Sequence, residues 1–197
     1  MAGRILRCAV TESGAVRLSV REEHFEGDVR RCFTLSGEDY ERLGAPVSGD
    51  EADDELIASL AEAEGRYKAT ARAVSLLSHG DNSARGLCRK LRSRGYDRES
   101  AEAAVANMLQ KGYIREQEQA RRIAVTCATR KLWGRRRIVA SLAEKGYDLS
   151  LARQVIEEAE RDGEIDFEET KKELLSRKLG EGASYDEKRA LLYRYGY

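Results

Sequence analysis

Apolar residues recur at helical spacing through most of the chain. Leu87 and Leu91 are four residues apart within the segment 83–94, which places them on one face of a helix. The segment from Ala101 to Met108 carries apolar residues at positions i, i+3, i+4 and i+7, which again form a single stripe. The pattern predicts two consecutive amphipathic helices that share a core.

The same pattern returns about fifty residues later in the chain. Sliding the sequence by 51 residues aligns 95–97 with 146–148, both Gly-Tyr-Asp, and a further shift of 50 aligns 146–147 with Gly-Tyr at 196–197. Glycine suits the left-handed residue that ends a helix, and the tyrosine after it can contact the leucine of the last turn. The aspartate is a good N-cap for the next helix.

Each copy also begins with a helical segment, at 70–78, 118–132 and 167–179, so the repeating unit is predicted to have three helices. The third copy lacks its last helix. The predicted fold is therefore mainly α: tandem three-helix repeats, two complete and a third truncated, in an elongated and curved array. We predict four parts, namely an N-terminal extension and linker at 1–50, a helical lead-in with repeat one at 51–115, repeat two at 116–165 and the truncated third repeat at 166–197.

The N-terminal extension has a different pattern. Residues 15–21 alternate apolar Val16, Leu18 and Val20 with polar side chains, which is typical of a half-buried strand. Residues 5–10 alternate more weakly, and a third strand is predicted near 30–35. Residues 45–55 contain the single proline and a cluster of acids, a pattern typical of a linker or the start of a helix.

Charge is unevenly distributed, although 35 basic and 35 acidic residues balance overall. Residues 1–64 carry a net charge of about −8 and the remainder about +8. This asymmetry favours an anionic partner for the helical repeats. The balanced total predicts weak non-specific DNA binding at physiological salt.

The basic residues of repeats one and two are the candidate binding residues. Equivalent helices of a tandem array tend to line one surface, so the two groups could form a continuous face for nucleic acid or an acidic protein surface. The alternatives are a solvated face for the charges and a core position for Trp133. The candidates are Arg85, Arg89, Lys90 and Arg92 in repeat one, and Arg121, Arg122, Arg130, Lys131, Trp133, Arg135, Arg136 and Arg137 in repeat two.

The sequence gives no sign of catalysis or of a cofactor. It contains no phosphate-binding loop or GxSxG or HExxH motif, and its four cysteines and two histidines are scattered without metal-binding spacing. We therefore expect no enzyme, no catalytic residue, no metal site and no cofactor. Neither a signal peptide nor a stretch long enough to span a bilayer is apparent, so no membrane association is expected.

Residues 67–197 resemble the RecX family of bacterial regulators of the RecA recombinase. The likeness is carried by the segment 71–114, by "GRRRIVASLAEKGYD" at 134–148 and by "KRALLYRYGY" at 188–197. After Gly112 the family usually shows two acids and then an aromatic residue. Here Arg115-Glu116 and Gln119 stand in those places, so that Glu116 alone serves the helix dipole.

The resemblance implies a cytoplasmic, monomeric protein of DNA repair, recombination and the SOS response. Family members bind along the groove of the RecA–DNA filament and restrain strand exchange, ATP hydrolysis and coprotease activity. Some also bind single- or double-stranded DNA. Two alternatives stay open, namely a DNA-binding protein built from helix-turn-helix-like units and a helical adaptor for another protein.

Overall fold

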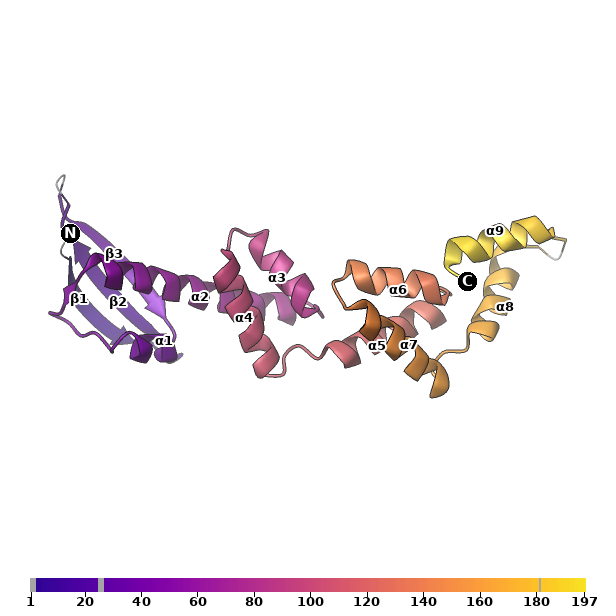
Figure 1. Cartoon of the computed structure of the whole chain (residues 1–197), viewed down its shortest axis with the longest axis horizontal. Coiled ribbons are helices and arrows are strands. Elements are labelled where there is room, and N and C mark those ends of the chain that lie inside the picture. The colour runs from indigo at the N-terminus through magenta and orange to yellow at the C-terminus, as the bar shows by residue number, and fades with distance from the viewer. Residues whose placement is uncertain (1–2, 25–26, 181) are drawn as a thin grey trace. The chain divides into compact units, whose positions relative to one another are not determined.

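The computed structural model describes residues 3–24, 27–180 and 182–197. The chain folds into two compact units (Figure 1). The first is formed by residues up to 79 together with 88–110, and the second by 80–87 together with 111–197. Helix α3 (Ala84–Arg92) therefore contributes residues to both units.

The first unit begins with a four-stranded antiparallel sheet in the order β3-β2-β1-β4. Val16, Leu18 and Val20 are buried on one face of β2, as the alternation predicted. They share a core with residues of helix α2 (Asp54–Ser78), which lies over the sheet (Figure 1). The first strand contains a β-bulge between Ile5 and Arg7, which explains its weaker alternation. The strands are β1 (Gly3–Val10), β2 (Val16–Glu22), β3 (Val29–Leu35) and β4 (Glu51–Ala52).

The segment 45–55 has more structure than a linker. Glu51 and Ala52 pair with the start of β1 as the short edge strand β4, which its acidic composition did not predict. Asp53 then caps helix α2 (Asp54–Ser78), since its carboxylate accepts a hydrogen bond from the backbone N–H of Leu56. The expected helix start is thus confirmed, and α2 runs without a break into repeat one.

Helix α4 (Arg98–Gln110) packs along α2 in the first unit. Its predicted apolar stripe is buried, including Ala101, Ala104 and Met108, none of which exposes measurable surface. Asp97 caps this helix by accepting a hydrogen bond from the backbone N–H of Ser100 at 2.8 Å. The hydrogen bonds donated by Ser100 lower the pKa of Asp97.

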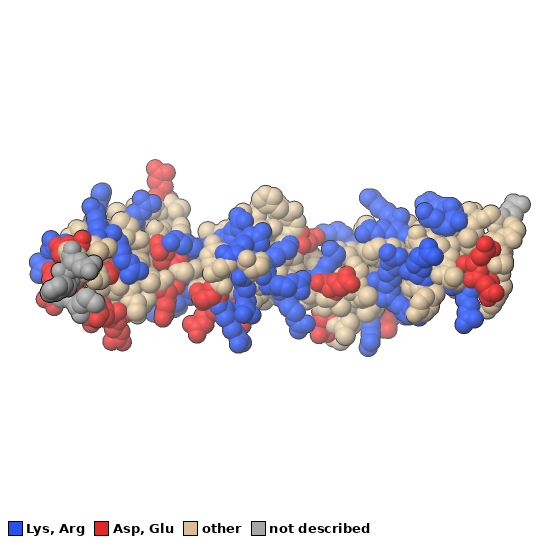
Figure 2. All heavy atoms as spheres, turned by 90° about the horizontal axis from the view of Figure 1, so that it is seen from above, with Lys and Arg blue, Asp and Glu red and all other residues tan. Residues whose placement is uncertain are grey.

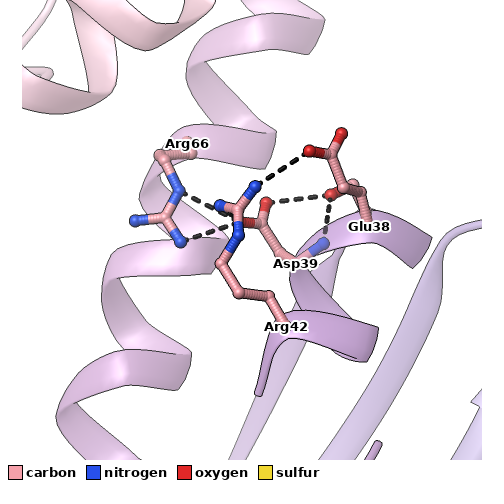
Figure 3. Close-up of polar contacts among 5 residues, drawn as sticks. Glu38, Asp39, Arg42 and Arg66 are labelled. Carbon is pink, nitrogen blue, oxygen red and sulfur yellow. Dashed lines mark hydrogen bonds and ion pairs between the residues drawn. The ribbon is translucent and has the colours of Figure 1, made fainter. Parts of the chain in front are cut away.

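A buried carboxylate holds the short helix α1 (Gly37–Arg42) against α2 (Figure 3). Asp39 Oδ1 accepts hydrogen bonds from Arg66 Nη2 at 2.8 Å and Nε at 3.2 Å, and from Arg42 Nη1 at 3.3 Å. Its other oxygen accepts the hydroxyl hydrogen of Ser36, the N-cap of α1. Arg42 also pairs with the exposed Glu38.

Replacing Asp39 with alanine is expected to lower the free energy of unfolding by about 2–4 kcal/mol, because it leaves Arg66 partly buried without its counter-ion. Glu38→Ala is the matched control. Its carboxylate is 79% exposed, so that loss is expected to stay below about 1 kcal/mol. Urea unfolding followed by circular dichroism measures both. Equal losses in the two variants would contradict a role for the buried carboxylate in holding α1.

The second unit consists of repeat two, the shortened repeat three and the start of α3. A core centred on Ile138, Leu142 and Ile156 holds repeat two together, and a smaller one around Leu174 and Leu191 holds repeat three. The predicted apolar stripe of α7 is buried. The helices are α5 (Glu116–Thr129), α6 (Arg135–Glu144), α7 (Leu149–Arg161), α8 (Phe167–Lys178) and α9 (Tyr185–Tyr195).

The Gly-Tyr pairs end helices as predicted. Gly95, Gly146 and Gly196 all have φ between 89° and 95°, in the left-handed region. The tyrosine N–H after each glycine donates to the carbonyl of the leucine four residues before that glycine. The three N–H···O distances are 3.4 Å for Tyr96 to Leu91, 3.1 Å for Tyr147 to Leu142 and 3.0 Å for Tyr197 to Leu192.

Candidate binding surface

Helix α6 begins against the end of α9. Gly134, its N-cap, offers no side chain to satisfy the free N–H groups of the first turn. The carbonyl groups at the end of α9 take that role. The N–H of Gly134 donates to Tyr195 O at 2.8 Å, and that of Arg136 donates to Gly196 O at 3.1 Å. The partial charges of the two helix ends are opposite, so their meeting is favourable.

The start of α3 is covered in an equivalent way within the second unit. Ser83 donates its hydroxyl hydrogen to Lys145 O, at the end of α6, at 2.7 Å. Glu116 accepts the N–H of Ala84 at 2.8 Å. Glu116 was expected to serve the dipole of its own helix α5, whose first turn it does occupy. Its additional contact with α3 links residues 32 positions apart and could not be seen in the sequence.

Two arginines predicted as binding residues are occupied by acidic partners. Arg121 donates to Asp162 at 2.5 Å and to Glu164 at 2.9 Å, and these hydrogen bonds raise its pKa. The same contact lowers the pKa of Asp162. Arg122 pairs with Asp81. These acids lie about 40 positions away in the sequence, so the local charge count of repeat two missed them.

Trp133 and Arg137 support the fold of the second unit. The indole is half-buried against the core of repeat two, with Lys131 Nζ 4.5 Å and Arg137 Cζ 4.3 Å from its ring centroid. Arg137 also lies 5.4 Å from the ring of Tyr195 and donates to Arg194 O. These contacts agree with the alternative of a core position for Trp133. Lys131 and Arg137 already stack on its ring.

The remaining arginines of α6 face a pocket of about 330 Å³ between α6 and α7. Arg135 and Arg136 line one side, with Arg153 and Glu157 from α7 opposite them. Arg135 pairs with Glu160 and stacks on Phe167, whereas Arg136 stacks on Tyr193. Arg153 is exposed and has no hydrogen bond or ion pair to any described residue.

Arg153 is a residue that the sequence interpretation missed. Its only local signal is Glu157 four positions later on the polar face of α7, which indicates a solvated helix face. Only the packing of α7 on α6 brings it beside Arg135 and Arg136. The resulting group of three guanidinium groups around a pocket suits phosphate or carboxylate oxygens.

The other candidate residues are exposed, but they do not line the pocket between α6 and α7. Arg130 and Lys131 follow the end of α5. All four candidates on α3 are exposed, and Arg85, Arg89 and Arg92 lie on the side away from the buried Leu87 and Leu91. Arg85 contributes to lowering the pKa of Asp148, whose main cause is the hydrogen bond from the Ser150 side chain. Figure 2 shows Lys and Arg side chains gathered over the part of the second unit formed by α6 and α9.

The described residues contain no group of three or more His, Cys, Asp or Glu side chains that could hold a metal ion. Cys127 is buried, and burial raises the pKa of its thiol. Burial likewise raises the pKa of Tyr147 to about 12. None of the helices in the described part of the chain has the length and apolar composition needed to cross a membrane.

No model of a protein family matches the sequence, and no curated protein matches it. A crystal structure of regulatory protein RecX matches with a TM-score of 0.74 and 18% sequence identity, covering 99% of this chain and 94% of that chain. The chain has the fold of RecX. A crystal structure of RecX from Lactobacillus salivarius matches with a TM-score of 0.45 and 18% identity, covering 68% of this chain and 97% of that chain. The RecX fold confirms the predicted class: mainly helical, with a small N-terminal sheet.

Proposed function

We propose that this protein regulates the bacterial RecA recombinase by binding the RecA–DNA filament in the cytoplasm. The observation that carries the proposal is the RecX fold over 99% of the chain. The sequence motifs that carry the resemblance to the RecX family lie in the helical part of this fold. The protein acts by occupying a surface of the filament, and through it modulates strand exchange, ATP hydrolysis and coprotease activity.

The pocket between α6 and α7 is the proposed contact. Its arginines come from α6 on one side and α7 on the other, and Arg136 is held by the ring of Tyr193 at 4.7 Å. Arginine binds carboxylates and phosphates through two parallel hydrogen bonds, so the pocket fits an acidic side chain of the filament or the exposed phosphates of its DNA. Glu157 also lines the pocket, where its carboxylate offsets part of the positive charge of the three arginines.

The test is the rate of DNA-dependent ATP hydrolysis by RecA of the same organism, titrated with this protein. A progressive fall at substoichiometric ratios is expected. An unchanged rate at every ratio, with the protein folded by circular dichroism, would reject the proposal. Electron microscopy of the filaments then shows whether the protein lies along them.

Direct DNA binding by helix-turn-helix-like units is less favoured by the geometry. In such units the start of the second helix approaches the bases. Here the start of α6 is covered by Tyr195 and Gly196, and that of α3 by Lys145 and Glu116. Binding of duplex DNA in the absence of RecA, with preference for one base sequence, would favour this alternative over the proposal.

A further inference from the structure

The outer face of the N-terminal sheet is rich in arginine. On β2, Arg17, Ser19 and Arg21 alternate with the buried Val16 and Leu18 and therefore point away from α2. This face belongs to the part of the sequence with a net charge of about −8, so the average charge conceals it. It lies in the first unit and shares no residue with the pocket of α6 and α7.

Strand register brings further arginines onto the same face. Arg21 is paired with Arg4 on β1 and with Arg30 on β3, which makes a row of three arginines across three strands. Arg7 lies opposite Ser19, one row further along. Arg4 and Arg7 are three residues apart and would normally point to opposite faces. The bulge between Ile5 and Arg7 brings both onto the outer face.

This arrangement is unfavourable without a counter-charge, because like charges directly opposite on neighbouring strands destabilise a sheet. Two acids partly offset it. Asp28 lies 3.6 Å from Arg21, and Glu51 is the strand partner of Arg4. Arg4, Arg7 and Arg17 are nevertheless exposed and form no hydrogen bond or ion pair with a described residue. An anionic ligand would remove the repulsion.

The chemistry of the face distinguishes nucleic acid from an acidic protein. A stable protein interface needs apolar or aromatic anchors at its centre. The centre of this face holds Ser19, Cys32 and Thr34, with Ala9 beside them. No aromatic side chain occupies these rows, so base stacking has no platform either. What remains is an array of guanidinium groups, which suits phosphate oxygens.

The dimensions also fit. Successive rows along β2 are about 6.8 Å apart, so the rows of Arg21, Ser19 and Arg17 span about 14 Å. That distance corresponds to about four steps, or about five phosphates, along one strand of a double helix at 3.4 Å per step. We propose that the outer face of this sheet binds the phosphate backbone of nucleic acid without reading its sequence. The proposal is independent of the proposed action on RecA and is tested without RecA.

The experiment measures binding of the full chain to a fluorescein-labelled 30-nucleotide single strand of mixed sequence, by fluorescence anisotropy between 50 and 200 mM salt. The test variant is Arg4→Gln/Arg7→Gln/Arg17→Gln. It is expected to bind at least tenfold more weakly at 50 mM salt. The slope of log Kd against log salt is expected to become shallower by about 2, since each lost phosphate contact on a single strand removes about 0.7.

The control variant, Arg72→Gln/Arg161→Gln/Arg189→Gln, changes the charge equally at exposed positions outside the face. It should leave the slope unchanged. A lysine version, Arg4→Lys/Arg7→Lys/Arg17→Lys, keeps the charge and should keep the slope while binding more weakly. Thermal unfolding confirms that each variant is folded, and the lysine version provides a readout if the glutamine variant is not.

Three results would overturn the proposal. The first is no binding by the unchanged protein at 50 mM salt. The second is an equal loss in the test and control variants. The third is displacement of the labelled strand by poly-glutamate as effectively as by an unlabelled oligonucleotide of equal charge. That result would assign the face to an acidic protein segment instead. A charged face that only prevents edge-to-edge association of the sheet would give the first or second result.

Discussion

Replacing Gly146 with alanine is expected to lower the free energy of unfolding of the second unit by about 2–5 kcal/mol. Part of the loss, about 1–2 kcal/mol, comes from the left-handed backbone at φ 95°. The rest is steric. The new Cβ would lie 2.8 Å from Ser83 Oγ and 2.9 Å from the backbone nitrogen of Gly86.

The steric part arises where the end of α6 meets the start of α3. A backbone nitrogen inside a helix cannot move aside as the tip of a side chain can, so relief requires the two helix ends to separate. Separation breaks the hydrogen bond from Ser83 to Lys145 O as well. The variant should therefore also increase amide hydrogen exchange at residues 84–87.

Gly95→Ala is the matched control, since Gly95 has the same kind of helix end at φ 89° but nothing within 4 Å of its Cβ position. Its cost is expected to be only about 1–2 kcal/mol, the backbone part alone. Urea unfolding and exchange followed by mass spectrometry measure both variants. Equal losses would mean that the close approach of the two helix ends contributes nothing to stability.

The double reversal Arg136→Glu/Arg153→Glu is expected to raise the concentration needed for half-maximal inhibition of RecA by about 100-fold. Each arginine supplies a charge-assisted hydrogen bond worth about 1.5–3 kcal/mol, and about 1.4 kcal/mol corresponds to a factor of ten. Both residues line the pocket of α6 and α7, and neither forms an ion pair with a described acid. The measurement is the RecA ATPase titration with this variant.

Arg137 is left unchanged in that design, because its contacts with Trp133 and Tyr195 make it part of the fold. Arg137→Glu serves instead as the structural comparison. It is expected to lower the Tm of the second unit more than the double reversal does, because Arg137 stacks on two aromatic rings and Arg136 on one. Arg72→Glu/Arg189→Glu controls for total charge at exposed positions away from the pocket. Inhibition weakened equally by this control would reject the pocket as the contact.

The helices and their ends could be predicted from the sequence because the interactions that define them are local. The bond from Tyr147 N–H to Leu142 O joins residues five apart, and the cap of Asp148 on Ser150 joins residues two apart. Apolar stripes at helical spacing specify which face of each helix is buried. The resemblance to the RecX family also rested on these spacings, and the fold agrees with it.

The properties of the charged side chains were decided by the tertiary structure. Arg121 and Arg122 belong to the most basic stretch of the sequence, yet they are paired with acids about 40 positions away. Arg153 joined the pocket only through the packing of two helices, and the row of arginines on the sheet exists only because of strand register and one bulge. Composition and periodicity determine which elements form, whereas the neighbours of a charge depend on contacts between residues distant in sequence, and no local pattern records those contacts.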